Sequence, residues 1–80
     1  MSGPTEATLA EILTLVLERP VAPAETVLRE AEPKWDSLKH IEIVMAVEAA
    51  FGVSFSAEEM GALTGSADIL QKIGGRAGAA

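Results

Sequence analysis

The chain has 80 residues, of which 49% are hydrophobic, and its twelve acidic and six basic side chains give a net charge of −6. This length predicts one small domain with a modest core, and the absence of cysteine excludes disulfides and thiolate metal sites. The six cations are scattered along the chain, which argues against the clustered basic surface that nucleic-acid binding needs.

The first residues lack the basic and apolar regions of a signal peptide. No apolar run approaches the roughly 20 residues that cross a bilayer. The sequence therefore predicts a cytoplasmic protein that neither inserts into membranes nor binds nucleic acid. Its negative charge favours a monomer whose partners carry basic patches.

The stretch TEATLAEILTLVLER, residues 5–19, predicts the first helix after a flexible N-terminus at residues 1–4. Its apolar side chains recur at helix spacing: Leu9, Ile12, Leu13, Val16 and Leu17. Thr5 is a suitable N-cap, and Pro20 and Pro23 end the helix.

A long loop is expected at residues 19–35, which contain three prolines and no periodic run. Its apolar anchors are expected to be Val21, Val27 and Leu28, with one short turn within residues 25–32. Loops of this length are often functional or are held by their own side chains.

The second helix is predicted from Ser37 to Phe51, with Asp36 as its N-cap and Gly52 as its stop. GVSFS should then direct Val53 and Phe55 inward.

Two shorter helices complete the predicted fold. Ser56 and Glu59 form a capping box for a third helix over residues 57–63. A last helix is predicted over residues 66–73 and a disordered tail over residues 74–80. The prediction is an all-α, four-helix bundle over residues 5–73, with one short helix and a long first loop.

The second helix has two apolar sides at about 100° per residue. The expected core stripe comprises Ile43, Val44, Val47, Ala50 and Phe51. The other side comprises Leu38, Ile41 and Met45, flanked by the carboxylates Glu42 and Glu48. A core does not normally interleave unpaired carboxylates with apolar side chains, so this side predicts a partner-docking surface. The alternative is that Leu38 and Ile41 cover the long loop.

Ser37 could be a helix cap, a nucleophile or an attachment point. His40 is one turn away, but no carboxylate is obviously placed to orient it as a triad requires, so we expect it at the surface or half-buried. With Asp36 as the cap, the Ser37 hydroxyl should stand in solvent at the helix N-terminus. That end of a helix tolerates a phosphate, and Lys34 and Lys39 add positive charge nearby.

The stretches WDSLKHIEIVMAVEAAFGV, residues 35–53, and SAEEMGALTGSADILQKI, residues 56–73, resemble the acyl carrier protein family. The resemblance implies that Ser37, between Asp36 and Leu38, carries 4′-phosphopantetheine attached from coenzyme A by a phosphopantetheinyl transferase. It implies a non-catalytic carrier that holds acyl or aminoacyl groups as thioesters. The enzymes it would supply are acyl-transferring or ligating enzymes of fatty-acid, polyketide or related metabolism.

In this family helix 2 commonly faces basic patches on partner enzymes. The resemblance thus assigns docking to Leu38, Ile41, Glu42, Met45 and Glu48. It also suggests an apolar acyl cleft between helices 2 and 3, walled by Met45, Ala46, Phe55, Ala62 and Leu63, with ordinary core packing as the alternative for these residues.

Some positions depart from the pattern of fatty-acid carriers. Lys34 stands where many of them have glycine, and Trp35, Lys39 and His40 are also unusual. These departures suggest a specialised pathway. Trp35 either packs over the loop with its indole N–H at the rim or has a role in specificity. An unmodified helical interaction module that docks through helix 2 is the alternative to a carrier.

Overall fold

A computed structural model describes residues 4–76 of the chain. Its helices are α1 (Pro4–Leu17), α2 (Ser37–Phe51), α3 (Ala57–Ala62) and α4 (Ser66–Arg76), with a short 3-10 helix, η1 (Arg29–Ala31), in the first loop. Within residues 4–76 there is no strand, only an isolated antiparallel bridge between Leu28 and Gly65. The all-α prediction is confirmed.

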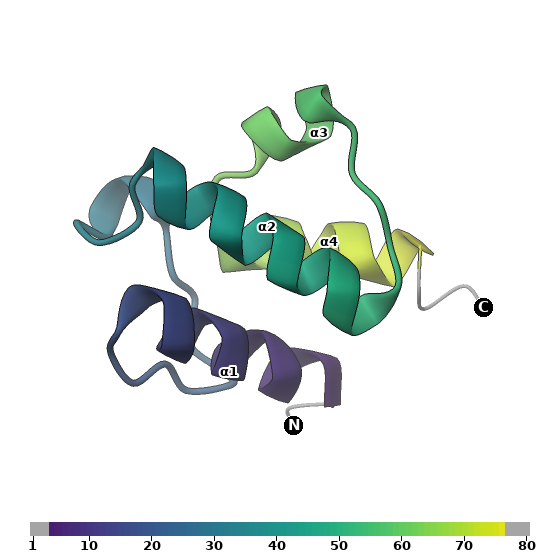
Figure 1. Cartoon of the computed structure of the whole chain (residues 1–80). Helices are drawn as coiled ribbons and strands as arrows, with labels where there is room; N and C mark the ends of the chain where they lie inside the picture. Colours follow the sequence, from purple (N-terminus) through teal and green to yellow (C-terminus); the bar gives the residue numbers. More distant parts are fainter. Residues whose placement is uncertain (1–3, 77–80) are drawn as a thin grey trace.

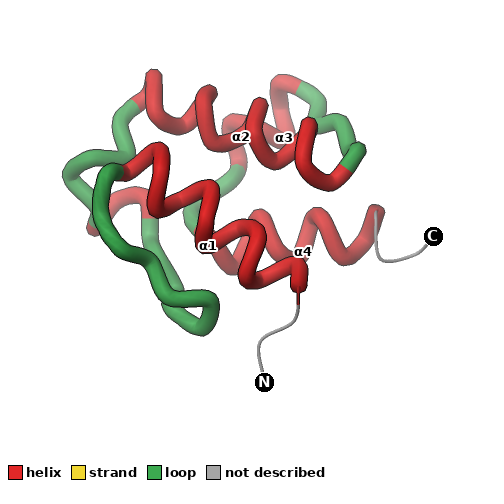
Figure 2. Tube along the Cα trace, turned by 60° about the horizontal axis from the view of Figure 1, so that its bottom comes forward, coloured by secondary structure: helices red, strands yellow, loops and turns green. Residues whose placement is uncertain are grey.

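The three longer helices form the body of the molecule (Figure 1). α1 and α2 run in opposite directions, and α4 lies behind α2 and runs the same way as α2. The short α3 lies apart from this body, on the side of α2 away from α1. The long loop leaves the end of α1 as an extended excursion before it reaches α2 (Figure 2). The molecule is flat, with extents of 34 × 31 × 17 Å.

The caps of α2 agree with the prediction at both ends. Asp36 is extended and accepts a hydrogen bond from the Lys39 amide, so the helix begins at Ser37. Gly52 follows the last residue in the left-handed conformation, with φ of 66°. This conformation is accessible to glycine at little cost, which is why the helix stops there. The capping box of Ser56 and Glu59 is likewise confirmed.

Other helix ends differ from the prediction. α1 begins at Pro4, so Thr5 lies inside the helix and is not its N-cap. It ends at Leu17, because Glu18 turns left-handed with φ of 57°. α3 ends one residue early, at Ala62, while α4 continues through three residues assigned to the disordered tail and ends at Arg76. Residues 1–3 and 77–80, also predicted to be flexible or disordered, lie outside the described residues.

The core is aliphatic and lies between α1, α2 and α4. It contains Leu9, Leu13 and Leu17 of α1, Ile43, Val44 and Val47 of α2, and Ile69 and Ile73 of α4. Val53 and Phe55 point inward as expected, and Val21 and Val27 anchor the loop. Two expectations were wrong: Ala50 and Leu28 are exposed, because the buried stripe of α2 is narrower than predicted and Leu28 faces away from the core.

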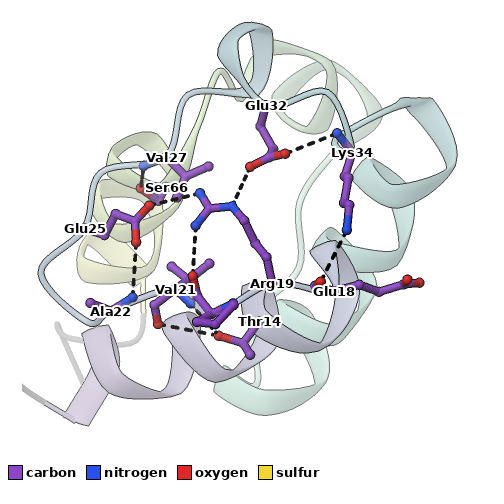
Figure 3. Close-up of polar contacts among 11 residues, drawn as sticks. Thr14, Glu18, Arg19, Val21, Ala22, Glu25, Val27, Glu32, Lys34 and Ser66 are labelled. Atoms are coloured by element: carbon purple, nitrogen blue, oxygen red, sulfur yellow. Dashed lines mark hydrogen bonds and ion pairs between the residues drawn. The ribbon is translucent and has the colours of Figure 1, made fainter.

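The first loop is fastened by a network around Arg19 (Figure 3). Its guanidinium donates to Glu32 at 2.6 Å, to Glu25 at 2.9 Å and to the Pro20 carbonyl at 2.9 Å. The Val21 amide also donates to Thr14 of α1 at 3.0 Å. The two carboxylates hold the pKa of Arg19 above its usual value, and Arg19 holds the pKa of Glu25 and of Glu32 below theirs.

The far end of the loop is pinned to the start of α4. The Val27 amide donates to the Ser66 hydroxyl, and the Ser66 amide donates back to the Val27 carbonyl, both at 2.9 Å. The Arg29 amide donates to the Thr64 carbonyl at 2.8 Å. Gly65 permits this approach because a Cβ there would overlap the Val27 carbonyl oxygen. These bonds hold the part of the loop that leads towards α2 against the start of α4.

Candidate functional site

Ser37 is the first residue of α2 and is exposed. Its hydroxyl makes no hydrogen bond within residues 4–76, because Asp36 takes the capping role. The Asp36 carboxylate accepts from the Lys39 amide at 2.8 Å, and the Asp36 carbonyl accepts from the His40 amide at 2.9 Å. Because Asp36 provides the cap, the exposed residue Ser37 keeps its hydroxyl without a hydrogen-bond partner among the described residues.

The start of α2 offers hydrogen-bond donors to an anion. The amides of Ser37 and Leu38 have no acceptor within the described part of the chain, and the helix dipole adds partial positive charge there. The neighbouring lysines contribute less than predicted. The Lys34 ammonium reaches the Glu18 carbonyl at 3.3 Å. The Lys39 ammonium lies 3.7 Å from carboxylates of both Glu18 and Glu42.

His40 is buried, with 5% of its surface exposed, so its expected surface or half-buried position was wrong. The indole N–H of Trp35 donates to Nδ1 of His40 at 2.9 Å. Nδ1 is therefore unprotonated, and Nε2 carries the hydrogen that meets the Met60 carbonyl at 2.7 Å. With both ring nitrogens engaged, His40 is not placed as the general base that a nucleophilic Ser37 would need.

The burial of Trp35 also corrects the expectation of an indole N–H at the rim. Trp35 is 3% exposed, and its ring centroid lies 6.1 Å from that of His40. The chain of hydrogen bonds from Trp35 through His40 to Met60 joins the end of the loop, the first turn of α2 and α3. Its polar atoms are satisfied, so the buried imidazole carries no penalty for a missing partner.

The second apolar side of α2 is exposed as predicted. Leu38 and Met45 are each 63% exposed and Ile41 is 46% exposed, with the exposed carboxylate of Glu42 beside them. The alternative that Leu38 and Ile41 cover the loop is not what the structure shows. We call Leu38, Ile41, Glu42 and Met45 the α2 face. Its leucine, isoleucine and methionine are three and four residues apart in sequence, so they form an apolar strip along one side of the helix.

Glu48 differs from the other four predicted docking residues. It is half-buried, and its carboxylate accepts a hydrogen bond from the Phe55 amide at 2.8 Å. This bond fixes the segment between α2 and α3, with Phe55 directed into the core. Glu48 therefore has a structural task that sequence periodicity alone did not indicate.

The five residues predicted to wall an acyl cleft do not line a common cleft. Met45 and Ala62 are exposed, Ala46 is half-buried, and Phe55 and Leu63 are buried. Of these, only Leu63 lines a cavity of about 590 Å³ that lies between the first loop and the end of α3. Its other lining residues are Leu28, Arg29, Glu30, Trp35, Gly61 and Thr64.

Sequence reasoning did not assign this cavity, because its walls come from segments separated by about thirty residues. The pairing of the loop with the residues before α4 creates it, through the Arg29–Thr64 hydrogen bond and the Leu28–Gly65 bridge. The one available signal was Trp35, a large aromatic residue at the end of a long loop.

Comparisons with protein-family models, with curated proteins and with solved structures found no match. Among residues 4–76, no three His, Asp or Glu side chains gather as a metal site would require. No helix in the same range is long and apolar enough to span a membrane.

Proposed function

We propose that this chain is a carrier protein that receives 4′-phosphopantetheine on Ser37 and presents acyl or aminoacyl groups to partner enzymes. The observation that supports this most is the exposed Ser37 hydroxyl at the first residue of α2, which has no hydrogen-bond partner within the described residues. A serine used only as a cap would direct its oxygen to a backbone amide, as Ser56 does.

The residues around Ser37 fit the prosthetic group. Its phosphate would lie at the amides of Ser37 and Leu38, where the helix dipole favours negative charge, while the capping bonds of Asp36 keep that end of the helix formed. The group supplies a terminal thiol, which the chain lacks because it has no cysteine, and which holds the cargo as a thioester.

Attachment requires a separate enzyme, because no side chain activates the Ser37 hydroxyl. In the transfer, a bond forms between Ser37 Oγ and the pantetheine-bearing phosphorus of coenzyme A. The pyrophosphate bond breaks, adenosine 3′,5′-bisphosphate leaves, and the hydroxyl proton passes to a base of the transferase. We propose a phosphopantetheinyl transferase as the first partner of the α2 face.

The α2 face also suits the enzymes that would load and unload the arm. Its apolar strip lies beside Glu42, so a complementary partner has an apolar groove with basic residues at its edge. A cytoplasmic monomer supplying fatty-acid, polyketide or related enzymes is part of this proposal. The departures at Lys34, Trp35, Lys39 and His40 favour a specialised pathway over bulk fatty-acid synthesis.

Intact-mass measurement tests the modification directly. After co-expression with a phosphopantetheinyl transferase, the protein should gain the mass of phosphopantetheine. Ser37→Ala should abolish the gain, whereas the control Ser54→Ala, at another exposed serine, should keep it. Absence of any gain with several unrelated transferases contradicts the carrier proposal.

The exposed α2 face also favours the second candidate, an unmodified interaction module that docks through α2. That candidate predicts that an unmodified chain captures its partner as tightly as the modified one. It also predicts that Leu38→Ala and Met45→Ala weaken capture while Ser37→Ala has no effect.

A further inference from the structure

The cavity between the first loop and α3 has the composition of a small-ligand site. Its volume is about 590 Å³, within the range of ligand pockets. Leu28, Trp35 and Leu63 provide apolar walls, and Gly61 leaves room where a side chain would stand. Thr64 adds a polar edge, and its amide and hydroxyl both donate to the carboxylate of Asp68.

One of the two charged residues that line this cavity, Arg29, forms no ion pair with another described residue. Arg29 is half-buried, yet its guanidinium makes no hydrogen bond or ion pair within residues 4–76. Its backbone amide is fixed to the Thr64 carbonyl at 2.8 Å, so the residue is held at the cavity. Arg19, by contrast, engages two carboxylates. Arg29 is only half-buried, so its guanidinium keeps contact with water, and its donors remain available to an anionic ligand through charge-assisted hydrogen bonds.

The cavity is close to Ser37. Trp35, one of its walls, precedes Ser37 by two residues, which places their Cα atoms at most about 7 Å apart. A flexible arm attached to Ser37 therefore starts close to one wall of the cavity.

We propose that this cavity binds the end of the carried group, and that Arg29 selects short acyl groups with a terminal carboxylate. This inference rests on the proposed carrier function and specifies its cargo. The planar guanidinium can bind both carboxylate oxygens, while Leu28, the exposed one of the three apolar lining residues, contacts the methylene groups. Glu30 is also at the cavity but is exposed, so its charge is screened more strongly than that of Arg29.

The test compares cargoes that differ only at their ends. A promiscuous transferase loads the protein from butanoyl-, succinyl- or 4-aminobutanoyl-coenzyme A, and intact mass verifies loading. The readouts are the emission of Trp35, which is the only tryptophan, and the NMR shifts of the Trp35 indole N–H, the Arg29 side chain and Gly61. The succinyl form should show the largest response at these positions, with about tenfold greater occupancy of the cavity than the butanoyl form, equivalent to about 1.4 kcal/mol.

Arg29→Gln should reduce the succinyl response to the butanoyl level. The matched control Lys72→Gln, which removes the same charge on α4 outside this cavity, should leave the succinyl response unchanged. Failure of Ser37 to load overturns the carrier proposal and this inference together. Successful loading followed by equal responses to all three cargoes, or by the largest response to 4-aminobutanoyl, overturns this inference and leaves the carrier proposal standing.

Discussion

The first loop and α3 form an instructive contrast. The loop has only three residues of 3-10 helix, yet Arg19, Thr14 and Ser66 fasten it at both ends. α3 is regular helix, yet none of its residues is buried, and it packs only lightly on the other helices. Regular hydrogen bonding within a segment does not determine how firmly that segment is held to the rest of the fold.

This difference has a functional meaning in the proposed carrier. The fastened loop leads into α2, while Asp36 sets the start of that helix at Ser37. The lightly held α3 borders the same cavity from the other side, where movement would change the size of that cavity. The loop wall is thus fastened by more hydrogen bonds than the wall that α3 provides.

The largest expected effect comes from unfastening the loop. Gly65→Ala should destabilise the protein by about 1–3 kcal/mol, because the new Cβ overlaps the Val27 carbonyl and the backbones must separate. Urea denaturation of the variant and the parent measures the loss. Gly61→Ala in α3 is the control. The Cβ added at position 61 meets no atom within 4 Å. This variant should therefore be more stable than the parent by up to about 1 kcal/mol, since alanine is the better helix former. Equal losses in the two variants would refute the contrast.

His40→Leu removes the hydrogen bond that joins α2 to the Met60 carbonyl of α3. The substitution leaves the Trp35 indole N–H and the Met60 carbonyl without their buried partner, at a cost of about 1–2 kcal/mol. Hydrogen exchange should accelerate about tenfold in α3, the equivalent of about 1.4 kcal/mol in local opening. Amides of Val21 and Val27 in the loop should respond less. Uniform acceleration across the chain would show that α3 is not a separate unit.

Glu48 and Glu42 provide a smaller comparison on α2. Glu48→Lys removes the acceptor of the Phe55 amide and should cost about 1 kcal/mol. Glu42→Lys, at an exposed position, should change stability by less than about 0.5 kcal/mol. Thermal unfolding of both variants separates them. If the prediction holds, Glu42→Lys alone is the appropriate variant for testing partner docking, because reversal at Glu48 also disturbs the fold.

The smallest expected effect is the pH dependence of the stability that the Arg19 ion pairs contribute. Arg19 lowers the pKa of both Glu25 and Glu32 from their ordinary value of 4.5. Their contribution to stability is therefore complete above that value and is lost as pH falls through the lower values of the folded state. Arg19→Met should unfold at a lower temperature than the parent at neutral pH, and the difference should shrink towards about pH 3. The measurement is the Tm of both proteins from neutral pH to about pH 3. A difference in Tm between parent and variant that stayed constant over this range would contradict the ion-pair network around Arg19.

What the sequence predicted well was governed by local chemistry. Asp36 and Gly52 define α2 because each acts on backbone groups within four residues of itself. The same holds for Ser56 and Glu59 at α3. The exposed α2 face followed from periodicity together with the cost of burying Glu42, so Leu38, Ile41 and Met45 were correctly expected outside the core.

What the sequence did not predict depends on partners distant in the chain. His40 is buried only because Trp35 and the Met60 carbonyl satisfy both ring nitrogens, and neither contact has a sequence signature. Glu48 has helix spacing suited to the surface, but it meets the Phe55 amide beyond the end of its own helix. The cavity at Arg29 requires the pairing of Leu28 with Gly65, which no local pattern encodes.

The left-handed residue at the end of α1 offers an opportunity for protein engineering. Glu18 adopts a conformation that costs a residue with a side chain roughly 1–2 kcal/mol relative to glycine. Glycine at position 18 would recover part of that amount and keep the carbonyl that receives Lys34. The same substitution would remove one of the two carboxylates near the Lys39 ammonium. The more heat-tolerant variant would therefore carry more positive charge at the N-terminus of α2.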